Sequence, residues 1–260
     1  MDIPKWENKQ LDAFYSHEFD FDNQYKETYD DWIRAFDKAV AKLSAPGCFI
    51  GIGSGYDSGA IVCSLIKQGI DFRAYVVRGK ENKKVLDERM ELIPNYRYFD
   101  NSYFKGEKNW VAKNVEDFEY AWGQHLIADS ATWVLSKLCK VALAEGRTIQ
   151  LSGQGGDEIT SDYALRPALS TFKGVFPEKL FCWDNFYGGG QRSYLMKEEN
   201  TAKVHGIDTR YPFLDIDVVQ EFLWLSTKLK NAHYKAPIRE YLVRNNFPFV
   251  EDVKQGLTIR

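Results

Sequence analysis

The sequence predicts an α/β protein in which a parallel, twisted sheet has helices on both faces and the C-terminal part is helical. Apolar runs at 48–53 and 72–77 flank a helical pattern, and this order is that of a βαβ unit. A further apolar run at 148–151 leads, like the first, into a glycine-rich loop. Two loops of the same kind are therefore expected at the carboxyl edge of one sheet.

The composition is that of a folded chain that binds neither nucleic acid nor membrane. The 34 Lys and Arg residues stand against 37 Asp and Glu, which gives a net charge of −3. Phosphate backbones require a clustered basic surface, which this balance does not favour. No run approaches the roughly 18 apolar residues of a membrane span. Because the first residues also lack the apolar core of a signal peptide, a cytoplasmic location is expected.

Helical periodicity, breakers and capping residues locate the other elements. The elements expected in chain order are a helix at about 28–43, strands at 48–53 and 72–77 around a helix at 60–66, a strand at 96–99, a long helix that Asp129 caps, a strand at 148–151, and helices that begin near Asp215 and Pro237. We find no repeat, low-complexity tract or linker. Residues 25–260 are therefore expected to form one domain, and residues 1–24 a lead segment.

The first loop, Gly53 to Gly59, has the features of an anion site. A glycine-rich bend between a strand and a helix turns backbone N–H groups and the helix N-terminus toward a phosphate. Neither the Walker pattern nor the dinucleotide pattern G-x-G-x-x-G is present. Asp57 would repel a phosphate unless a divalent cation lay between them, so Mg²⁺ is implied. The alternative is an ordinary turn in which Asp57 or Ser58 caps the helix.

The second loop, Leu151 to Glu158, combines three glycines with Asp157 at the end of another strand. Two such loops on one sheet predict a two-sided clamp for a metal-bound triphosphate. The alternative is a glycine-rich turn in which Asp157 caps the following helix.

Four stretches together resemble the synthetase domain of asparagine synthetases and β-lactam synthetases, within the PP-loop group of ATP pyrophosphatases. The family's Ser-Gly-Gly-x-Asp-Ser aligns with 53–58, and its Leu-Ser-Gly-Glu-Gly-x-Asp-Glu with 151–158. Its His-Gly-x-Glu-x-Arg-x-Pro-Phe-Leu-Asp is matched by 205–215 with one change. A fourth motif is similar to 235–239, Pro248 and 254–257. The resemblance implies an adenine nucleotide alpha-hydrolase-like fold.

The resemblance implies an AMP-forming ligase. ATP adenylates a substrate carboxylate and releases pyrophosphate, and ammonia or an amine then attacks to give an amide. The implied cofactors are ATP and Mg²⁺, and the implied partners are a small carboxylate and an amine donor. The residues implied are Asp57 and Asp157 for the metal, Gly53, Ser54, Gly55, Asp57, Ser58, Val76, Ser152 and Gly153 for ATP or pyrophosphate, and Lys254, Asp208 and Gln154 for catalysis.

The chain departs from the family pattern at three of these positions. Gly53 stands where the family has serine, and Gln154 and Asp208 stand where it has glutamate. Asp208 could instead form a surface ion pair with Arg210. The glutaminase that begins asparagine synthetases is not expected here, because Asp2 follows Met1 where that domain has its cysteine. Nitrogen would then come from ammonia, a separate glutaminase, or a second substrate's amine.

Two other functions remain open. A nucleotide-binding module without catalysis would fold in the same way, and Gly53 and Gln154 would then mark lost activity. A thiolation or tRNA-modifying enzyme of the wider PP-loop group is the second alternative. The absence of a C-x-x-C pair, the lack of a basic face and the third motif argue against it.

Overall fold

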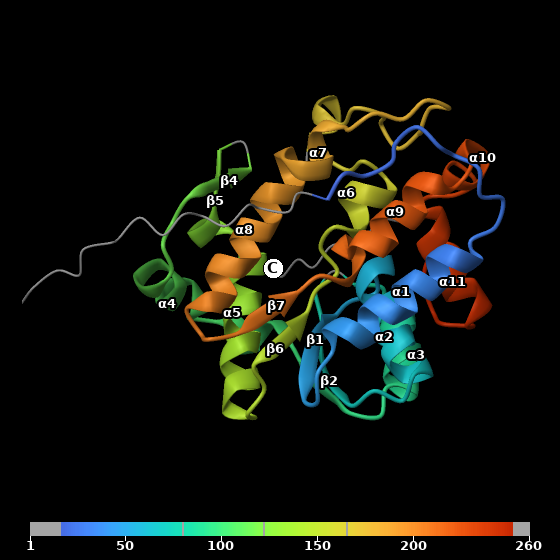
Figure 1. Ribbon diagram of the computed structural model, residues 1–260. Helices are drawn as coiled ribbons and strands as arrows, with labels where there is room; N and C mark the ends of the chain where they lie inside the picture. The colour runs from blue at the N-terminus through green and yellow to red at the C-terminus, as the bar shows by residue number, and fades with distance from the viewer. Residues whose placement is uncertain (1–16, 80, 122, 165, 252–260) are drawn as a thin grey trace, which may run out of the picture.

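The computed structural model describes residues 17–79, 81–121, 123–164 and 166–251, and the fold is α/β as predicted (Figure 1). Its main sheet has five strands, all parallel, in the order β3-β2-β1-β6-β7. These strands are β1 (Cys48–Ile52), β2 (Phe72–Val77), β3 (Tyr96–Phe99), β6 (Ile149–Leu151) and β7 (Asp208–Arg210). A separate antiparallel hairpin joins β4 (Glu119–Ala121) and β5 (Gln124–His125).

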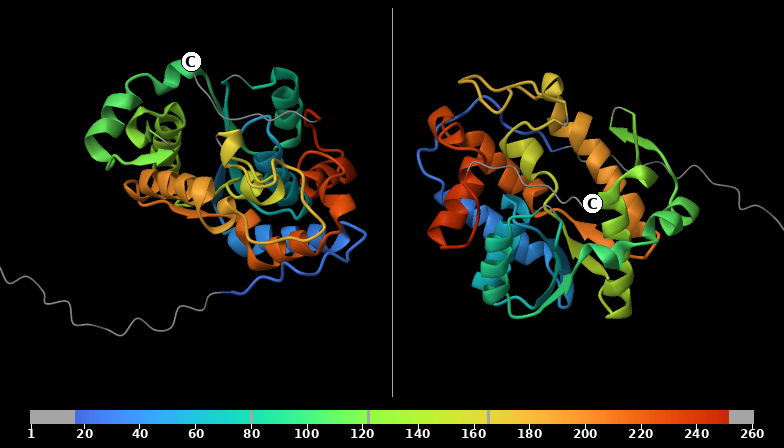
Figure 2. Two further views of the ribbon diagram at one scale, coloured as in Figure 1. Left: turned by 90° about the horizontal axis from the view of Figure 1, so that it is seen from above. Right: turned by 180° about the vertical axis from the view of Figure 1, so that it is seen from behind.

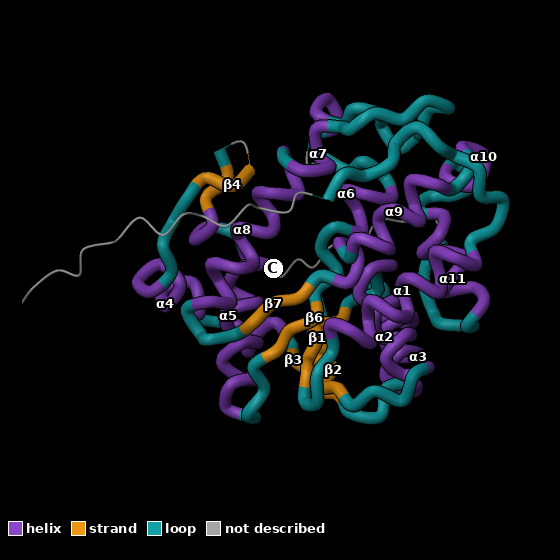
Figure 3. Tube along the Cα trace, in the orientation of Figure 1, coloured by secondary structure: helices purple, strands orange, loops and turns teal. Residues whose placement is uncertain are grey.

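The strand order changes direction next to β1, and this places the two predicted loops side by side. The chain leaves β1 toward β2 and β3, and returns on the other side of β1 as β6 and β7. Phe49 of β1 is in register with Gln150 of β6. Since both strands point the same way, the loops that follow them share one edge of the sheet (Figure 3). Ligands of open parallel sheets bind at such a point.

Helices cover both faces of the sheet, as Figures 1 and 2 show. Alternate residues of β1 pack in opposite directions: Ile50 and Ile52 join one core cluster and Phe49 joins the other. The first face carries α1 (Asp30–Leu43), α2 (Tyr56–Lys67), α9 (Ile216–Trp224) and α11 (Ala236–Arg244). The second face carries α5 (Ser130–Ala144), against which α8 (Gly189–Lys203) and α4 (Glu107–Asn114) pack. The remaining helices are α3 (Lys83–Leu92), α6 (Gly156–Thr160), α7 (Asp184–Tyr187) and α10 (Thr227–Lys230).

Capping chemistry in the sequence identified helix starts well. Asp129 accepts a hydrogen bond from the Ala131 amide at the start of α5, and Asp215 accepts one from the Asp217 amide at the start of α9.

The helix expected at 60–66 begins earlier, at Tyr56, so Asp57 lies in its first turn. The strand β7 was missed because its three residues, Asp-Thr-Arg, carry no apolar run. The helix α8 was missed because it begins with two glycines.

The described part of the lead segment packs on the domain. Phe19 and Phe21 contact the core cluster of the first face, and the Trp224 indole donates to Asp20. The boundary at residue 25 remains a prediction, and residues 1–16 lie outside the described part. Within the described residues, no helix is long and apolar enough to cross a membrane.

Candidate functional site

The two predicted loops touch at the carboxyl ends of β1 and β6. A Cβ atom added at Gly153 would lie 2.9 Å from the Asp57 Cβ. One added at Gly156 would lie 2.5 Å from Asp57 Oδ1, closer than carbon and oxygen atoms approach. Glycine is therefore needed at both positions for the second loop to reach Asp57.

A buried ammonium group joins the acidic residues of the two loops. Lys235 Nζ lies 2.6 Å from Asp57 Oδ2 and 2.8 Å from Asp157 Oδ1. The Lys235 side chain is only 3% exposed, and the Tyr234 hydroxyl donates to Asp157 Oδ1 at 3.0 Å. Burial alone lowers the pKa of Lys235, but Asp157 and Asp57 outweigh it and raise that pKa above its ordinary value. Lys235 is therefore an ammonium ion shared by two carboxylates.

The two carboxylates fit a magnesium ion that arrives with phosphates. Mg²⁺ prefers oxygen ligands, and it commonly uses one or two protein carboxylates while phosphates and water complete its shell. Among the described residues, no group of three or more His, Cys, Asp or Glu side chains is placed to hold a metal. Asp57 and Asp157 alone would leave most of the coordination shell of such an ion to phosphates and water.

The first loop already holds an anionic group, the carboxylate of Glu81. Glu81 Oε2 accepts from the Ser54 amide at 2.6 Å and from the Ser54 hydroxyl at 2.5 Å. A Cβ atom at Gly53 would lie 2.6 Å from Glu81 Oε1. Gly53 thus provides the space that Glu81 occupies, which gives a physical reason for a glycine at this position.

In the second loop, a buried carboxylate holds the Ser152 side chain. The Ser152 hydroxyl donates to Glu198 Oε2 at 2.7 Å, and the Gln150 amide donates to Glu198 Oε1 at 2.7 Å. The Gln154 backbone N–H donates to Ser152 Oγ at 3.2 Å. Burial raises the pKa of Glu198 to about 7, against the lowering effect of the Ser152 hydrogen bond.

A cavity of about 450 Å³ lies between the loops, α5 and α8. Every predicted residue of the two loops lines it except Ser54, which is buried. Its apolar part includes Val77 of β2 and Leu135 of α5, and its polar part includes Glu81, Glu198 and Gln154. A flat apolar ring and a charged phosphate chain could both be accommodated, since such pockets combine apolar walls with a few placed polar groups.

Besides Ser54, two of the predicted residues that the structure describes, Val76 and Asp208, do not line this cavity. Val76 is fully buried in the core, although its neighbour Val77 lines the cavity. Asp208 is opposite Ile149 at the amino end of β7, where it pairs with Arg210 at 2.9 Å. The structure thus separates Asp208 from the other site residues and shows the surface ion pair instead. Lys254 lies outside the described residues.

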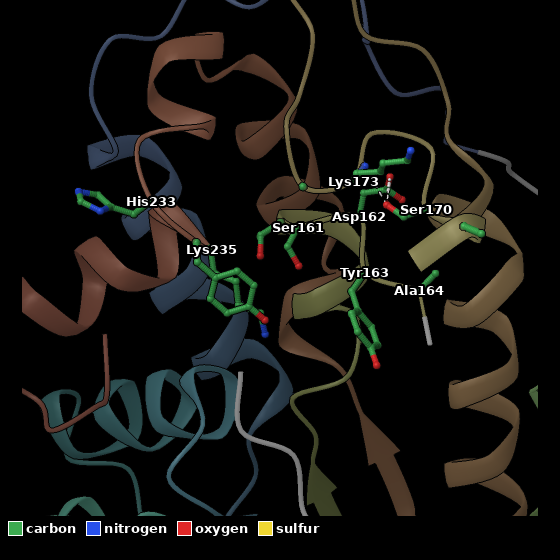
Figure 4. Close-up of a pocket in the computed structure, with 12 residues that line it drawn as sticks. Ser161, Asp162, Tyr163, Ala164, Ser170, Lys173, His233 and Lys235 are labelled. Atoms are coloured by element: carbon green, nitrogen blue, oxygen red, sulfur yellow. Dashed lines mark hydrogen bonds between the residues drawn. The ribbon is translucent and has the colours of Figure 1, made fainter. Parts of the chain in front are cut away.

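Figure 4 shows the residues that line a second cavity of about 450 Å³. Tyr163 lines both, and Lys235 and Tyr234 form part of the wall of the second. Asp162, Lys173 and Lys235 all line it and all have a positive φ, between 46° and 52°. Non-glycine residues rarely adopt this conformation, and they cluster where function requires a strained backbone.

Sequence reasoning missed three residues that organise the site. Lys235 stood in the fourth motif, but its pairing with the two acids depends on how α11 packs against α2. Glu81 and Glu198 lie 27 and 46 residues from the serines that they bind. No local pattern in the sequence marks either pairing.

Comparison with known proteins leaves the family open. No family model matches the chain, and no curated protein matches it. Among solved structures, an NMN synthetase from Francisella tularensis aligns over 88% of this chain and 96% of its own, with 12% identity and a TM-score of 0.33. Likeness at this level carries no argument, so the site rests on the contacts described above.

Replacing Glu198 by glutamine should make stability less dependent on pH. The folded-state pKa of Glu198, about 7, exceeds its ordinary value of 4.5, so the wild type loses stability as pH rises between these values. When the pH is raised from 4.5 to 8, the free energy of unfolding of Glu198→Gln should therefore increase by on the order of 3 kcal/mol relative to that of the wild type. Denaturant unfolding at both pH values measures this gain. The matched control is Glu199→Gln, and an equal effect of Glu198→Gln at both pH values would contradict the assignment.

Adding a methyl group at Gly53 should displace Glu81. Gly53→Ala should cost about 1–3 kcal/mol of folding free energy, and much less when Glu81 is already alanine. Unfolding of the two single variants and the double variant measures this coupling. Gly51→Ala is the control, because its Cβ would make an ordinary 3.5 Å contact with Leu138. Additive effects of Gly53→Ala and Glu81→Ala would show that the contact is not made.

Proposed function

We propose that this chain is an ATP-dependent, AMP- and pyrophosphate-forming ligase that joins a carboxylate to ammonia or an amine. One observation supports this most directly: acidic residues from two glycine-rich loops meet on a buried lysine at the switch point of a parallel sheet. This arrangement combines metal-binding carboxylates, a fixed cation and backbone donors. A triphosphate that loses pyrophosphate needs all three.

In this proposal, Asp57 and Asp157 hold Mg²⁺, which when bound neutralises charge on the leaving pyrophosphate. Lys235 could then pair with phosphate oxygens, because a metal held by Asp57 and Asp157 would neutralise their charge. Ser58, Gly55 and Gly153 line the phosphate end of the cavity, and the adenosine lies along Val77 and Leu135. Glu81 must release Ser54 before a phosphate can accept from its amide.

The second cavity offers a place for the carboxylate substrate, because Tyr163 lines both cavities and Lys235 of the second cavity contacts the two acids that line the first. Gln154 lines the nucleotide cavity from the second loop and, in the proposal, positions the acyl-adenylate. Lys254 is proposed to stabilise charge in the second step. Ammonia, the amine of a second substrate, or a separate glutaminase supplies the nitrogen.

Phosphorus NMR of the products tests the reaction class. The protein is incubated with ATP, Mg²⁺, ammonia and a panel of amino, sugar and nucleotide acids. AMP and pyrophosphate that appear together with one acid are the expected result. Binding of ATP without turnover on any acid would favour the non-catalytic module, and sulfur transfer into tRNA would favour the thiolation enzyme.

Removing either acidic charge should abolish Mg²⁺-dependent pyrophosphate release. Asp57→Asn and Asp157→Asn should each lower the rate at least about 100-fold, because each removes a metal ligand while leaving Lys235 one carboxylate partner. A coupled pyrophosphate assay and circular dichroism measure activity and folding. Asp71→Asn is the control, an exposed acid just before β2 at the opposite edge of the sheet. Full activity in Asp57→Asn or Asp157→Asn would refute the site assignment.

A further inference from the structure

Glu198 is a buried acid at the wall of the nucleotide cavity that has no cationic partner among the described residues. It is 7% exposed, and within the described chain no lysine, arginine or histidine nitrogen lies within 4 Å of its carboxylate oxygens. Its neighbour Lys197 is directed to Asp129 instead, at 2.8 Å. Within the part of the chain that the structure describes, its hydrogen bonds come from two neutral donors, Ser152 and Gln150. Neutral donors offset the cost of a buried charge less well than an ion pair does.

The protonation of Glu198 decides which way the Ser152 hydroxyl points. A hydroxyl has one proton to donate and two lone pairs that accept. The Gln154 N–H uses one lone pair of Ser152. An ionised Glu198 can only accept hydrogen bonds, so the Ser152 hydroxyl donates its proton to Glu198. Only the second lone pair of Ser152 Oγ then faces the cavity, where it can accept but not donate. A protonated Glu198 can donate to Ser152, which leaves the Ser152 proton for another acceptor.

We propose that Glu198 is a positioning residue that takes up a proton when the nucleotide binds, and so turns the Ser152 hydroxyl from Glu198 toward a phosphate or ribose oxygen. In the free protein, the Ser152 proton goes to the Glu198 carboxylate. In the complex, a proton from solvent is bound to Glu198 and is donated to Ser152 Oγ, and the Ser152 proton is donated to the nucleotide. This inference rests on the proposed nucleotide site.

The surroundings of Glu198 place this exchange near neutral pH. Burial raises the pKa of Glu198 to about 7, and Glu199 on the same helix raises it further, whereas Lys197 and the donors Ser152 and Gln150 lower it. Cys139 of α5 and Tyr211 after β7 also face it, and both stay neutral because burial raises their pKa values. The negative charge of a nucleotide next to Ser152 would raise the pKa of Glu198 further.

Calorimetric titration with Mg²⁺·ATP at pH 7.5, in buffers of different ionisation enthalpy, tests the proposal. The slope of the binding enthalpy against the buffer enthalpy gives the number of protons taken up. The wild type should take up about half a proton more than Glu198→Gln, because glutamine cannot titrate but can donate to Ser152 as the acid does. Glu199→Gln should keep most of the uptake, because it leaves Glu198 able to titrate and removes only a minor raising effect on the pKa of Glu198.

Ser152→Ala provides a second variant if Glu198→Gln does not fold. Loss of the Ser152 donor removes a lowering effect on the pKa of Glu198, so more of Glu198 is protonated before ATP arrives. This variant should therefore take up fewer protons than the wild type, and its affinity should fall several-fold. Equal proton uptake in the wild type and in either variant would overturn the role of Glu198 while leaving the nucleotide site intact. If the wild type does not bind Mg²⁺·ATP, both this inference and the proposed function fail.

Discussion

The contact between Lys235 and the two acids Asp57 and Asp157 determines how the candidate site is built. Burial lowers the pKa of a lysine that is 3% exposed, since it disfavours the charged form. The two carboxylates reverse this and keep an ammonium ion in the interior. Without Lys235, the acids would repel each other across the contact between the loops. The protein therefore holds two carboxylates neutralised on one ammonium ion, and in the proposed function a metal-bound phosphate chain would take the place of that ion.

The sheet makes this contact possible. Because the chain returns as β6 beside β1, two loops that are about 100 residues apart in the sequence leave one edge of the sheet together. Glycines at 153 and 156 then let the loops approach closely enough for Asp57 to meet the second loop. The start of α11, where Lys235 has a φ of 49°, brings the ammonium group between them.

The sequence predicted those parts of the site that depend on residues close together in the chain, and it missed those that depend on tertiary contacts. The strands at 72–77 and 96–99 and the caps Asp129 and Asp215 were predicted correctly, because apolar runs and capping side chains act within a few residues. The two loops were found because a glycine bend after a strand is also a local pattern. Glu81 and Glu198 were not found, since each meets its serine only through tertiary packing. Asp208 was placed in the site by resemblance, but β7 sets it at the opposite edge of the sheet.

A crystal structure with Mg²⁺ and the non-hydrolysable analogue α,β-methylene-ATP would test the central claim most directly. The account predicts a metal bound by Asp57 and Asp157, and Lys235 Nζ moved from the carboxylates to oxygens of the β- and γ-phosphates. It also predicts that Glu81 no longer accepts from the Ser54 amide. A nucleotide bound elsewhere, or one bound here with Lys235 still between the two acids and no metal on them, would contradict the account.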